Sequence, residues 1–352
     1  MTQQGMTQQA LRVAVIGYGW WGKIITRTLQ ESPAVKVVMV AEPDAAVRAV
    51  ASKAAREAAP RGGFSVTDSI EGAIGNPQVE AVVLTTPHQF HAEQISAAAR
   101  AGKHVFCEKP LCRTFAEAQS AIGACRKAGV VLGIGHERRF EPAVIDLRRR
   151  VAAGELGSIL QIEANFNQNK FFALPPDNWR LSKKQAPVGP LTATGIHLVD
   201  LAIALLGPAE SVWARLSARG SQFENGDTLG IMLGFPGGAT AMISAVLATP
   251  FDGRLAVYGS EGWTEIRDRT HPEHPTGWDV TQVARNGERS TAFMPPYPAV
   301  RANLEAFAAA VRGTAAYPVQ QEEMLANVAA LEAIMQSVDS GVIEKIAAPV
   351  LA

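Results

Sequence analysis

Residues 11–22 read LRVAVIGYGWWG, and this stretch decides the fold of the first half of the chain. Its first part is rich in valine and isoleucine and stops at Gly17, which is typical of a strand buried on both faces of a parallel sheet. Gly17, Gly19 and Gly22 form the pattern G-x-G-x-x-G, and a helix is expected over 20–31. A glycine turn that follows a buried strand and opens a helix is the context that a dinucleotide-binding βαβ unit requires.

The three glycines predict how a dinucleotide would bind. In such a turn the first glycine permits a tight bend, the second lets the backbone approach a pyrophosphate, and the third allows close packing of the helix on the strand. The pyrophosphate would lie at the helix N-terminus, where N–H groups and the helix dipole favour negative charge. The predicted dinucleotide contacts in this region are Gly17, Tyr18, Gly19, Trp20, Trp21, Gly22 and Glu42.

Glu42 bears on the choice between NAD and NADP. It ends the second expected strand, twenty residues after Gly22. A carboxylate at that position can accept hydrogen bonds from the adenosine ribose diol and would repel a 2′-phosphate. No lysine or arginine follows Glu42 before Arg48. The sequence therefore favours NAD over NADP, and the alternative is a glycine turn beside a glutamate that only faces solvent.

Strands and helices alternate up to about residue 135. Further strands are expected at 35–42, 81–87, 104–108 and 130–135, and further helices at 44–59, 91–100 and 114–128. Strands that alternate with helices of this length predict βαβ units. The first half is therefore expected to form an α/β domain with a Rossmann-type, doubly wound parallel sheet and right-handed crossovers.

The pattern changes beyond Glu137. Helices are expected at about 142–153, 195–206, 300–312 and 321–340, and strands at 158–167, 210–218, 228–235, 239–247, 254–259 and 262–267. Consecutive strands joined by short glycine-containing turns predict an antiparallel sheet. The domain boundary is expected near residues 135–142, which gives a nucleotide-binding domain at 10–137 and a second domain at 138–352.

The composition argues against several classes of protein. Lysine plus arginine and aspartate plus glutamate both number 33, so the chain lacks the basic surplus that binding to nucleic acid or to an anionic membrane requires. Cys107, Cys112 and Cys125 match neither a disulfide framework nor a zinc site, which favours a reducing compartment and no metal. No apolar run is long enough for a membrane span. The first ten residues, MTQQGMTQQA, lack the features of a secretion signal, so a cytoplasmic location is expected.

Residues 104–111, HVFCEKPL, contain a candidate catalytic lysine. Lys109 ends a buried strand at the carboxyl edge of the predicted sheet, where ligands of such sheets bind. Pro110 restricts Lys109 to an extended backbone and fixes the direction of its side chain. Glu108 could orient the ammonium group or hold a cofactor hydroxyl. The alternative is an ordinary surface lysine at the end of a strand.

Two further segments contain histidines. Residues 85–91, TTPHQFH, follow the preceding strand at the same edge, and the contacts predicted there are Thr85, Thr86, Pro87, His88 and His91. The alternative is that both histidines only begin a helix, because His88 lies near an N-cap position. His197 and Asp200 are three residues apart on one helix face, and a histidine can exchange a proton near neutral pH. The alternative there is a buried histidine that its helix neighbour satisfies.

Five segments together resemble the Gfo/Idh/MocA family of oxidoreductases: GYGWWG, TTPHQFH, AGKHVFCEKPL, ERRFEP and TGIHLVD. The resemblance runs from about Leu11 to Ile343. It implies a Rossmann domain followed by an α+β domain for substrate binding and oligomerisation, with a large, open, mostly antiparallel sheet that forms dimer or tetramer contacts in relatives. The implied reaction is NAD(P)-dependent oxidation of a secondary alcohol of a sugar, cyclitol or related diol, or the reverse reduction.

The resemblance also implies roles for individual residues. Lys109 is implied to stabilise the alkoxide, and His197 is implied to transfer the proton. Glu108 and Lys109 are expected to contact the cofactor, and the pair Trp179 and Arg180 is implied to lie near the nicotinamide. The residues expected to contact the substrate are Arg139, Lys170 and Asp200. A positive rim would suit an acidic substrate, and its cations would be Arg139, Lys170, Arg180, Lys183 and Lys184. The alternative is that these charges belong to a solvated loop.

The sequence departs from the family pattern at three places. Ala193 stands where many relatives carry an aspartate, residues 187–190 read PVGP in place of a glycine run, and His88 replaces the usual asparagine. Two other functions therefore stay open: a glycosidase of the same fold that uses NAD without net oxidation, and a dinucleotide-responsive regulatory protein without catalysis. The presence of both Lys109 and His197 favours the dehydrogenase.

Overall fold

The computed structural model describes residues 9–351, which form two compact units. The N-terminal unit contains the described residues up to Leu111 together with Gln119–Gly135 and Val300–Gln320. The C-terminal unit contains Cys112–Ala118, His136–Ala299 and the residues from Gln321 onward. Most of the stretch on which the cytoplasmic expectation depends, residues 1–8, lies outside the described residues.

A parallel sheet forms the centre of the N-terminal unit. Its strands are β1 (Leu11–Ile16), β2 (Val35–Ala41), β3 (Ser65–Thr67), β4 (Ala81–Leu84), β5 (His104–Cys107) and β6 (Leu132–Ile134). They lie in the order β3-β2-β1-β4-β5-β6, and each neighbouring pair is parallel. The order reverses between β1 and β4, where ligands of doubly wound sheets bind. The prediction of a doubly wound parallel sheet is confirmed.

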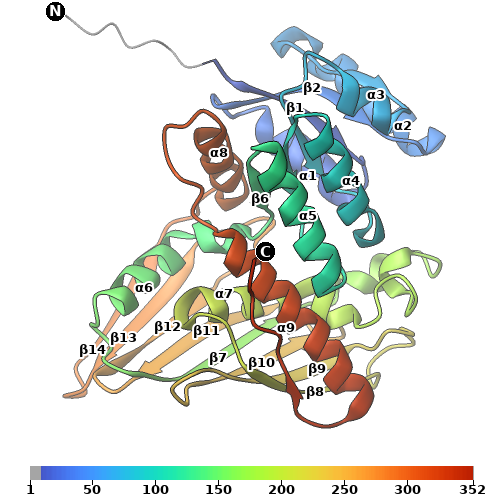
Figure 1. Cartoon of the computed structure of the whole chain (residues 1–352). Coiled ribbons are helices and arrows are strands. Elements are labelled where there is room, and N and C mark those ends of the chain that lie inside the picture. Colours follow the sequence, from blue (N-terminus) through green and yellow to red (C-terminus); the bar gives the residue numbers. More distant parts are fainter. Residues whose placement is uncertain (1–8, 352) are drawn as a thin grey trace, which may run out of the picture. The chain divides into compact units, whose positions relative to one another are not determined.

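Helices connect these strands (Figure 1). They are α1 (Trp20–Leu29), α2 (Ala45–Ala58), α3 (Ile70–Gly75), α4 (His91–Arg100) and α5 (Phe115–Ala128). Asp44 begins α2 by accepting a hydrogen bond from the N–H of Val47 at 2.8 Å. The sequence analysis did not anticipate β3 and α3, because three and six residues are too few for a hydrophobic period to become visible.

The segment Val300–Gln320, most of which is α8 (Ala299–Val311), groups with the N-terminal unit, whereas the sequence analysis placed it in the second domain. Asn303 Nδ2 and the Tyr317 hydroxyl both donate to the carbonyl oxygen of Ile134 in β6, at 2.9 and 3.0 Å. The ring of Phe307 packs edge-on against Phe106 of β5. Chain order alone does not show that so late a helix returns to the first sheet.

A mixed, mostly antiparallel sheet forms the C-terminal unit. Its strands are β7 (Ile159–Asn167), β8 (Ser211–Ser217), β9 (Thr228–Gly234), β10 (Thr240–Val246), β11 (Asp252–Gly259), β12 (Gly262–Asp268), β13 (Trp278–Ala284), β14 (Arg289–Met294) and β15 (Glu344–Lys345). The order is β14-β13-β12-β11-β7-β10-β9-β8-β15, and β7 pairs with β10 in parallel. This confirms the expected second fold. The sequence analysis did not anticipate β13 and β14, and β14 lacks a buried face that would produce alternation.

The C-terminal sheet has one buried face. The helices α6 (Pro142–Ala152), α7 (Ile196–Leu206) and α9 (Gln321–Ser340) lie along that face (Figure 1), and their apolar side chains join those of the strands in one core. The strands alternate between buried and more exposed residues, as expected for a half-buried sheet. Across residues 9–351, none of the helices has the length and apolar character needed to cross a membrane.

Candidate active site

The three glycines of the turn in the N-terminal unit have different structural surroundings. Gly17 and Gly22 are required by the fold of the turn, whereas Gly19 borders open space. Gly17 has a φ of 91°, a conformation that favours glycine. A Cβ at Gly22 would overlap the carbonyl oxygen of Gly17, so only a glycine lets α1 pack this close. A Cβ at Gly19 would meet no described atom within 4 Å. Gly19 is also the N-cap of α1 and has no side chain to cap it. This open helix end fits the pyrophosphate of a dinucleotide.

Glu42 links the glycine turn to the next loop. Its Oε2 accepts a hydrogen bond from the N–H of Tyr18 at 2.7 Å, and its Oε1 accepts one from the N–H of Asp44 at 3.0 Å. Arg48 Nη1 donates to the carbonyl oxygens of Glu42 and Pro43 at 2.9 and 2.6 Å. The Glu42 carboxylate is therefore fixed at the end of β2. The Arg48 guanidinium contacts the backbone carbonyl oxygens of the same turn.

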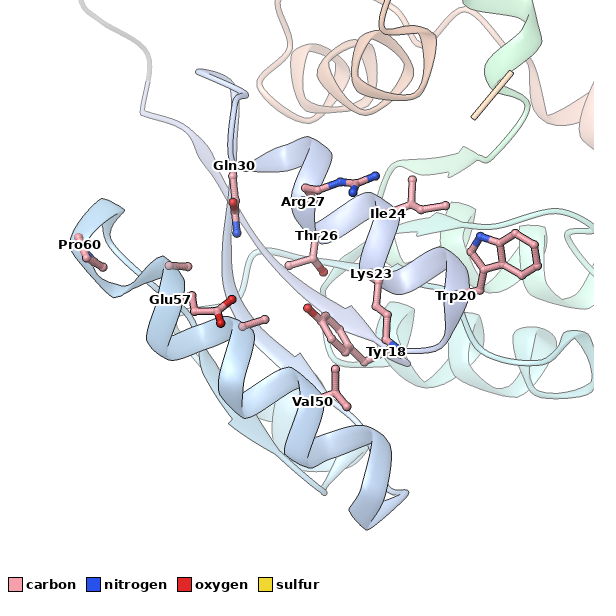
Figure 2. Close-up of a pocket in the computed structure, with 12 residues that line it drawn as sticks. Tyr18, Trp20, Lys23, Ile24, Thr26, Arg27, Gln30, Val50, Glu57 and Pro60 are labelled. Carbon is pink, nitrogen blue, oxygen red and sulfur yellow. The ribbon is translucent and has the colours of Figure 1, made fainter. Parts of the chain in front are cut away.

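Tyr18 belongs to the turn itself. Its N–H is used by Glu42, and its ring points into a groove between α1 and α2, close to Thr26 and Val50 (Figure 2). Burial, followed by the charge of Glu57, raises the pKa of the Tyr18 hydroxyl. The contact of Tyr18 with the dinucleotide stays a prediction. Trp20 lines the same groove (Figure 2), while contact of Trp20 and Trp21 with a dinucleotide stays a prediction.

The TTPHQFH segment supports the glycine turn through its threonine. Thr85 Oγ1 donates to the carbonyl oxygens of Ile16 and Gly17 at 3.0 and 2.8 Å. Thr86 Oγ1 donates to Gln94 Oε1 at 2.6 Å. Pro87 is the N-cap of the short helix His88–Phe90. These contacts hold the loop after β4 against the loop after β1, at the edge where the predicted dinucleotide would lie.

His91 lies between two loops and contacts the backbone of both. It is fully buried, with Nδ1 at 2.8 Å from the carbonyl oxygen of Pro110 and Nε2 at 2.9 Å from that of Thr86. Burial lowers the pKa of His91. Backbone carbonyl oxygens face both ring nitrogens, and the contact of His91 with the cofactor stays a prediction. His88 packs edge-on against this ring and is half-buried, so its cofactor contact stays a prediction.

Lys109 follows β5 on the same edge of the sheet. β5 lies beside β4, and β4 lies beside β1, so the carboxyl ends of the three strands place Lys109, Thr85 and Gly17 along one edge. Lys109 is half-buried, its N–H donates to Glu108 Oε2 at 3.3 Å, and the Lys109–Pro110 peptide bond is cis. Glu108 is buried against Gly135, where a Cβ would clash with its carboxylate.

His197 lies in the interior of the C-terminal unit. It is the second residue of α7, directly after a π-helical turn at Leu191–Gly195, and π-turns occur frequently at functional sites. Its Nδ1 lies 3.8 Å from Glu137 Oε1, and its ring contacts those of His136 and Phe166. The sequence analysis predicted Asp200 on the same helix face as a neighbour, but the ion-pair partner of His197 comes from another element.

Arg139 and Asp200 bind one another. Arg139 Nε and Nη2 donate to the two carboxylate oxygens of Asp200 at 2.8 and 2.7 Å, and the side chains are 1% and 2% exposed. Asp200 also lies 3.5 Å from Nε2 of His136, and Arg139 lies 2.9 Å from Glu323. The two groups therefore bind one another inside the unit, and the substrate contacts of Arg139 and Asp200 stay predictions.

A second buried arginine organises the same region. Arg138 pairs with Glu141 at 3.1 Å and with both oxygens of Asp268 at 2.7 and 2.8 Å. Burial, only partly offset by Arg138 and reinforced by the charge of Asp268, raises the pKa of Glu141 to about 8. Burial by itself would lower the pKa of Arg138, but the neighbouring Asp268 and Glu141 raise this pKa overall. The sequence shows these charged residues without showing that they are buried.

The remaining predicted residues lie on the loops after β7. Lys170 Nζ contacts Glu273 at 2.6 Å and His271 at 3.0 Å while keeping 29% of its side chain exposed. The Arg180 guanidinium lies 4.4 Å from the ring centre of Trp179, and burial lowers the pKa of Arg180 to about 10. The predicted ligand contacts of Lys170, Trp179 and Arg180 stay predictions. Ala193 packs against an apolar cluster of Phe171, Leu181 and Leu247.

Sequence reasoning missed the partners of His197. Glu137 and Glu141 were quoted only within the segment ERRFEP, and His136, Asp268 and Glu323 were not singled out. A run of charged residues directly after a buried strand was the available signal. Within residues 9–351 there is also no group of three or more histidine, cysteine or acidic side chains placed to hold a metal ion.

Comparisons with known proteins match both units. Residues 11–136 match a model described as an oxidoreductase family with an NAD-binding Rossmann fold, and residues 144–265 match the GFO/IDH/MocA C-terminal domain. A 1,5-anhydro-D-fructose reductase from Ensifer adhaerens is 34% identical over 71% of this chain and 74% of its own length. The NAD(+) scyllo-inositol 2-dehydrogenase of Bacillus subtilis is 30% identical over 76% and 77%. An aldose–aldose oxidoreductase from Caulobacter crescentus, solved with glycerol, superposes with a TM-score of 0.83 at 27% identity, over 96% of this chain and 100% of that one.

Proposed function

The chain belongs to the Gfo/Idh/MocA oxidoreductase family, and on that premise we propose that it oxidises a secondary alcohol of a sugar, cyclitol or related diol with NAD, or catalyses the reverse reduction. The observation that carries the proposal is the position of Lys109 on the same sheet edge as the open glycine turn. The names of the relatives, an anhydrofructose reductase and an inositol dehydrogenase, support this substrate class.

The preference for NAD is part of the proposal and depends on Glu42. Its carboxylate, held by the N–H groups of Tyr18 and Asp44, places negative charge at the end of β2. The carboxylate oxygens would accept hydrogen bonds from the ribose hydroxyls of NAD, and their negative charge would repel the 2′-phosphate of NADP. Relatives carry either NAD(+) or NADP(+) in their names, so the cofactor must be tested on this chain. Titration of wild type should give tighter NAD binding, and tighter NADP binding would overturn the preference.

A variant can test whether Glu42 causes that preference. Glu42→Gln should reduce the ratio of NADP to NAD dissociation constants by about tenfold, because one charge near a phosphate changes binding by roughly 1–2 kcal/mol. The control is Glu57→Gln on α2, whose side chain is 68% exposed and which should leave the ratio unchanged. An unchanged ratio in Glu42→Gln would assign cofactor choice to other groups.

Two side chains are proposed to carry the chemistry, Lys109 and His197. The bound dinucleotide supplies the acceptor or donor of the hydride. The Lys109 ammonium donates a hydrogen bond to the substrate oxygen and stabilises the alkoxide that develops there, an effect on the order of several kcal/mol in a site with little water. His197 accepts the hydroxyl proton, and general-base help of this kind contributes about 10²–10⁴-fold. Trp179 and Arg180 are proposed to border the nicotinamide, and Lys170 the substrate.

The decisive experiment screens polyols, sugars and cyclic diols with NAD and follows the appearance of NADH. Lys109→Met should lower kcat by about 10²-fold or more while NAD binding stays measurable. The control is Lys53→Ala, which removes a lysine whose side chain is 74% exposed on α2. Wild-type rates in Lys109→Met would refute the assignment. Turnover without net NADH would instead indicate the glycosidase, and NAD binding without any turnover would indicate the regulatory protein.

The outer face of the C-terminal sheet is proposed as the contact between subunits in a homodimer or homotetramer. Trp213, Met232 and Met242 are direct cross-strand neighbours on β8, β9 and β10, and their side chains are 38%, 43% and 50% exposed. Exposed apolar rows of this kind mark protein interfaces. Light scattering should give a multiple of the 37.4 kDa chain, and Met232→Asp with Met242→Asp should shift it to the monomer. The control is Val50→Asp on the N-terminal unit.

A further inference from the structure

Glu137 and His197 come from two elements of the C-terminal unit and meet in its interior. Glu137 begins a short 3₁₀ helix (Glu137–Phe140), and His197 lies on α7. Glu137 Oε1 is 3.8 Å from His197 Nδ1, and the side chains are only 10% and 5% exposed. We propose that Glu137 is the positioning residue that fixes the tautomer and the charge of His197, an inference that rests on the proposed function of His197 as the proton acceptor.

The other charged groups near His197 are bound to partners of their own. On the same helix, Asp200 receives a bidentate pair from Arg139, which also contacts Glu323 of α9. From the segment before the 3₁₀ helix, His136 faces His197 edge-on and lies 3.5 Å from Asp200. Glu137 places a carboxylate oxygen against the His197 ring, 3.8 Å from its Nδ1.

On the strand side, an aromatic ring packs against His197. Phe166 of β7 packs against the His197 ring at 6.1 Å, and its other neighbours are His271 and the Arg138 guanidinium. Arg138 is paired with Asp268 of β12 and with Glu141, the N-cap residue of α6. The apolar ring therefore separates His197 from that pair, and it lowers the local dielectric in which Glu137 acts.

The imidazole nitrogen that faces Glu137 is Nδ1, and this determines which nitrogen of His197 can accept a proton. A carboxylate opposite Nδ1 favours the neutral tautomer with the proton on Nδ1, which leaves Nε2 as the basic nitrogen. In the oxidation of a secondary alcohol, the hydroxyl proton would go to Nε2 and the hydride would leave the carbinol carbon for the dinucleotide, so that the C–O bond becomes a carbonyl and charge and electrons balance. The negative charge of Glu137 then stabilises the imidazolium that forms.

The position four residues before His197 does not supply such a carboxylate. Ala193 stands there, on the π-helical turn, and it packs against the apolar cluster of Phe171, Leu181 and Leu247. A carboxylate for His197 has to come from another element, and Glu137 reaches it from the segment that follows β6. The family pattern has an aspartate at position 193, whereas in this chain the carboxylate near His197 belongs to Glu137.

A measurement without substrate tests the pair directly. The chain contains seven histidines, so ¹⁵N-labelled imidazole spectra are simple enough to assign His197 by comparison with His197→Gln. Neutral His197 in wild type should carry its proton on Nδ1. In Glu137→Gln the titration midpoint of this ring should fall by about 1–3 pH units, the range expected when an opposite charge within 4–6 Å is removed. An unchanged midpoint and tautomer would overturn the proposal.

Kinetics then separate positioning from mere structure. Glu137→Gln should lower kcat about tenfold or more with little change in KM and should shift the acidic limb of the pH profile downward, whereas Glu137→Asp, which keeps the charge, should restore much of both. The control Glu323→Gln removes a carboxylate from the same network that faces Arg139, and it should leave the midpoint in place. Equal loss in Glu137→Gln and Glu137→Asp would overturn the proposal. If wild type proves inactive, the proposed function fails, while the imidazole titration still decides the pair.

Discussion

The glycine turn of the N-terminal unit and the charge cluster of the C-terminal unit are built from different parts of the chain. The turn is made of backbone: a positive φ at Gly17, a close helix at Gly22 and an open helix end at Gly19. The cluster is made of side chains, with Arg139 bound to Asp200 and His197 facing Glu137. A backbone site needs particular residues at fixed spacing, whereas a side-chain site needs only complementary groups that folding brings together.

The largest effect should come from breaking the side-chain cluster. Arg139→Met leaves Asp200 as a buried carboxylate without its bidentate partner, and such a loss costs about 3–5 kcal/mol of unfolding free energy. Urea denaturation measures it. The control is Arg267→Met on β12, whose side chain is 50% exposed and whose ion pairs should contribute less than about 1 kcal/mol. Similar losses in both variants would show that burial does not distinguish these pairs.

The backbone turn should separate stability from binding. Gly22→Ala forces a Cβ onto the Gly17 carbonyl and should cost about 1–3 kcal/mol together with NAD affinity. Gly19→Ala has room for its Cβ, so it should change stability by less than about 1 kcal/mol while weakening NAD binding at least tenfold, because the methyl group would fill the space beside the pyrophosphate. Unchanged NAD affinity in Gly19→Ala would show that the dinucleotide lies elsewhere.

A smaller effect of pH should distinguish the two units in the neutral range. The pKa of Glu141 is raised to about 8, mainly by burial, so the folded C-terminal unit holds a proton that the unfolded chain releases above about pH 4.5. The stability contributed by Glu141 should therefore be complete below about pH 4.5 and fall as the pH rises to about 8. In Glu141→Gln this part of the pH dependence should disappear from denaturation curves. A variant with the slope of wild type would contradict the assignment.

The smallest effect, of opposite sign, is expected in the N-terminal unit. The pKa of Glu80 is lowered to about 2, chiefly by its hydrogen bond with Arg312, with Arg12 adding to it. Its stabilising contribution should be present above about pH 4.5 and be lost as the pH falls toward 2. Glu80→Gln should remove that acid-range loss, and the partly exposed pair keeps the effect modest. The measurement is the free energy of unfolding of both proteins between about pH 5 and pH 2. An equal loss of stability in the variant and in wild type would contradict this prediction.

Sequence-based predictions succeeded where one residue type is required. The turn at Gly17, Gly19 and Gly22, its buried strand and the alternating elements were predicted because glycine geometry and apolar periodicity are local. The internal contacts of His91 and Arg139 were not predicted, because a histidine or an arginine looks the same in sequence whether it meets a ligand or is buried against its own chain. The return of Val300–Gln320 to the first unit was missed for a related reason, since long-range contacts leave no local period.

The sequence by itself determined the doubly wound sheet, the open glycine turn, the acidic residue at the end of the second strand and the lysine after the fifth. Each depends on residues close together in the chain, whose conformations local sterics and hydrophobic burial restrict. Only the tertiary structure decided which polar side chains meet: Arg139 with Asp200, Arg138 with Glu141 and Asp268, and His197 with Glu137. Electrostatic pairing is decided by distance in space and by exclusion of water, and neither quantity exists before the chain has folded.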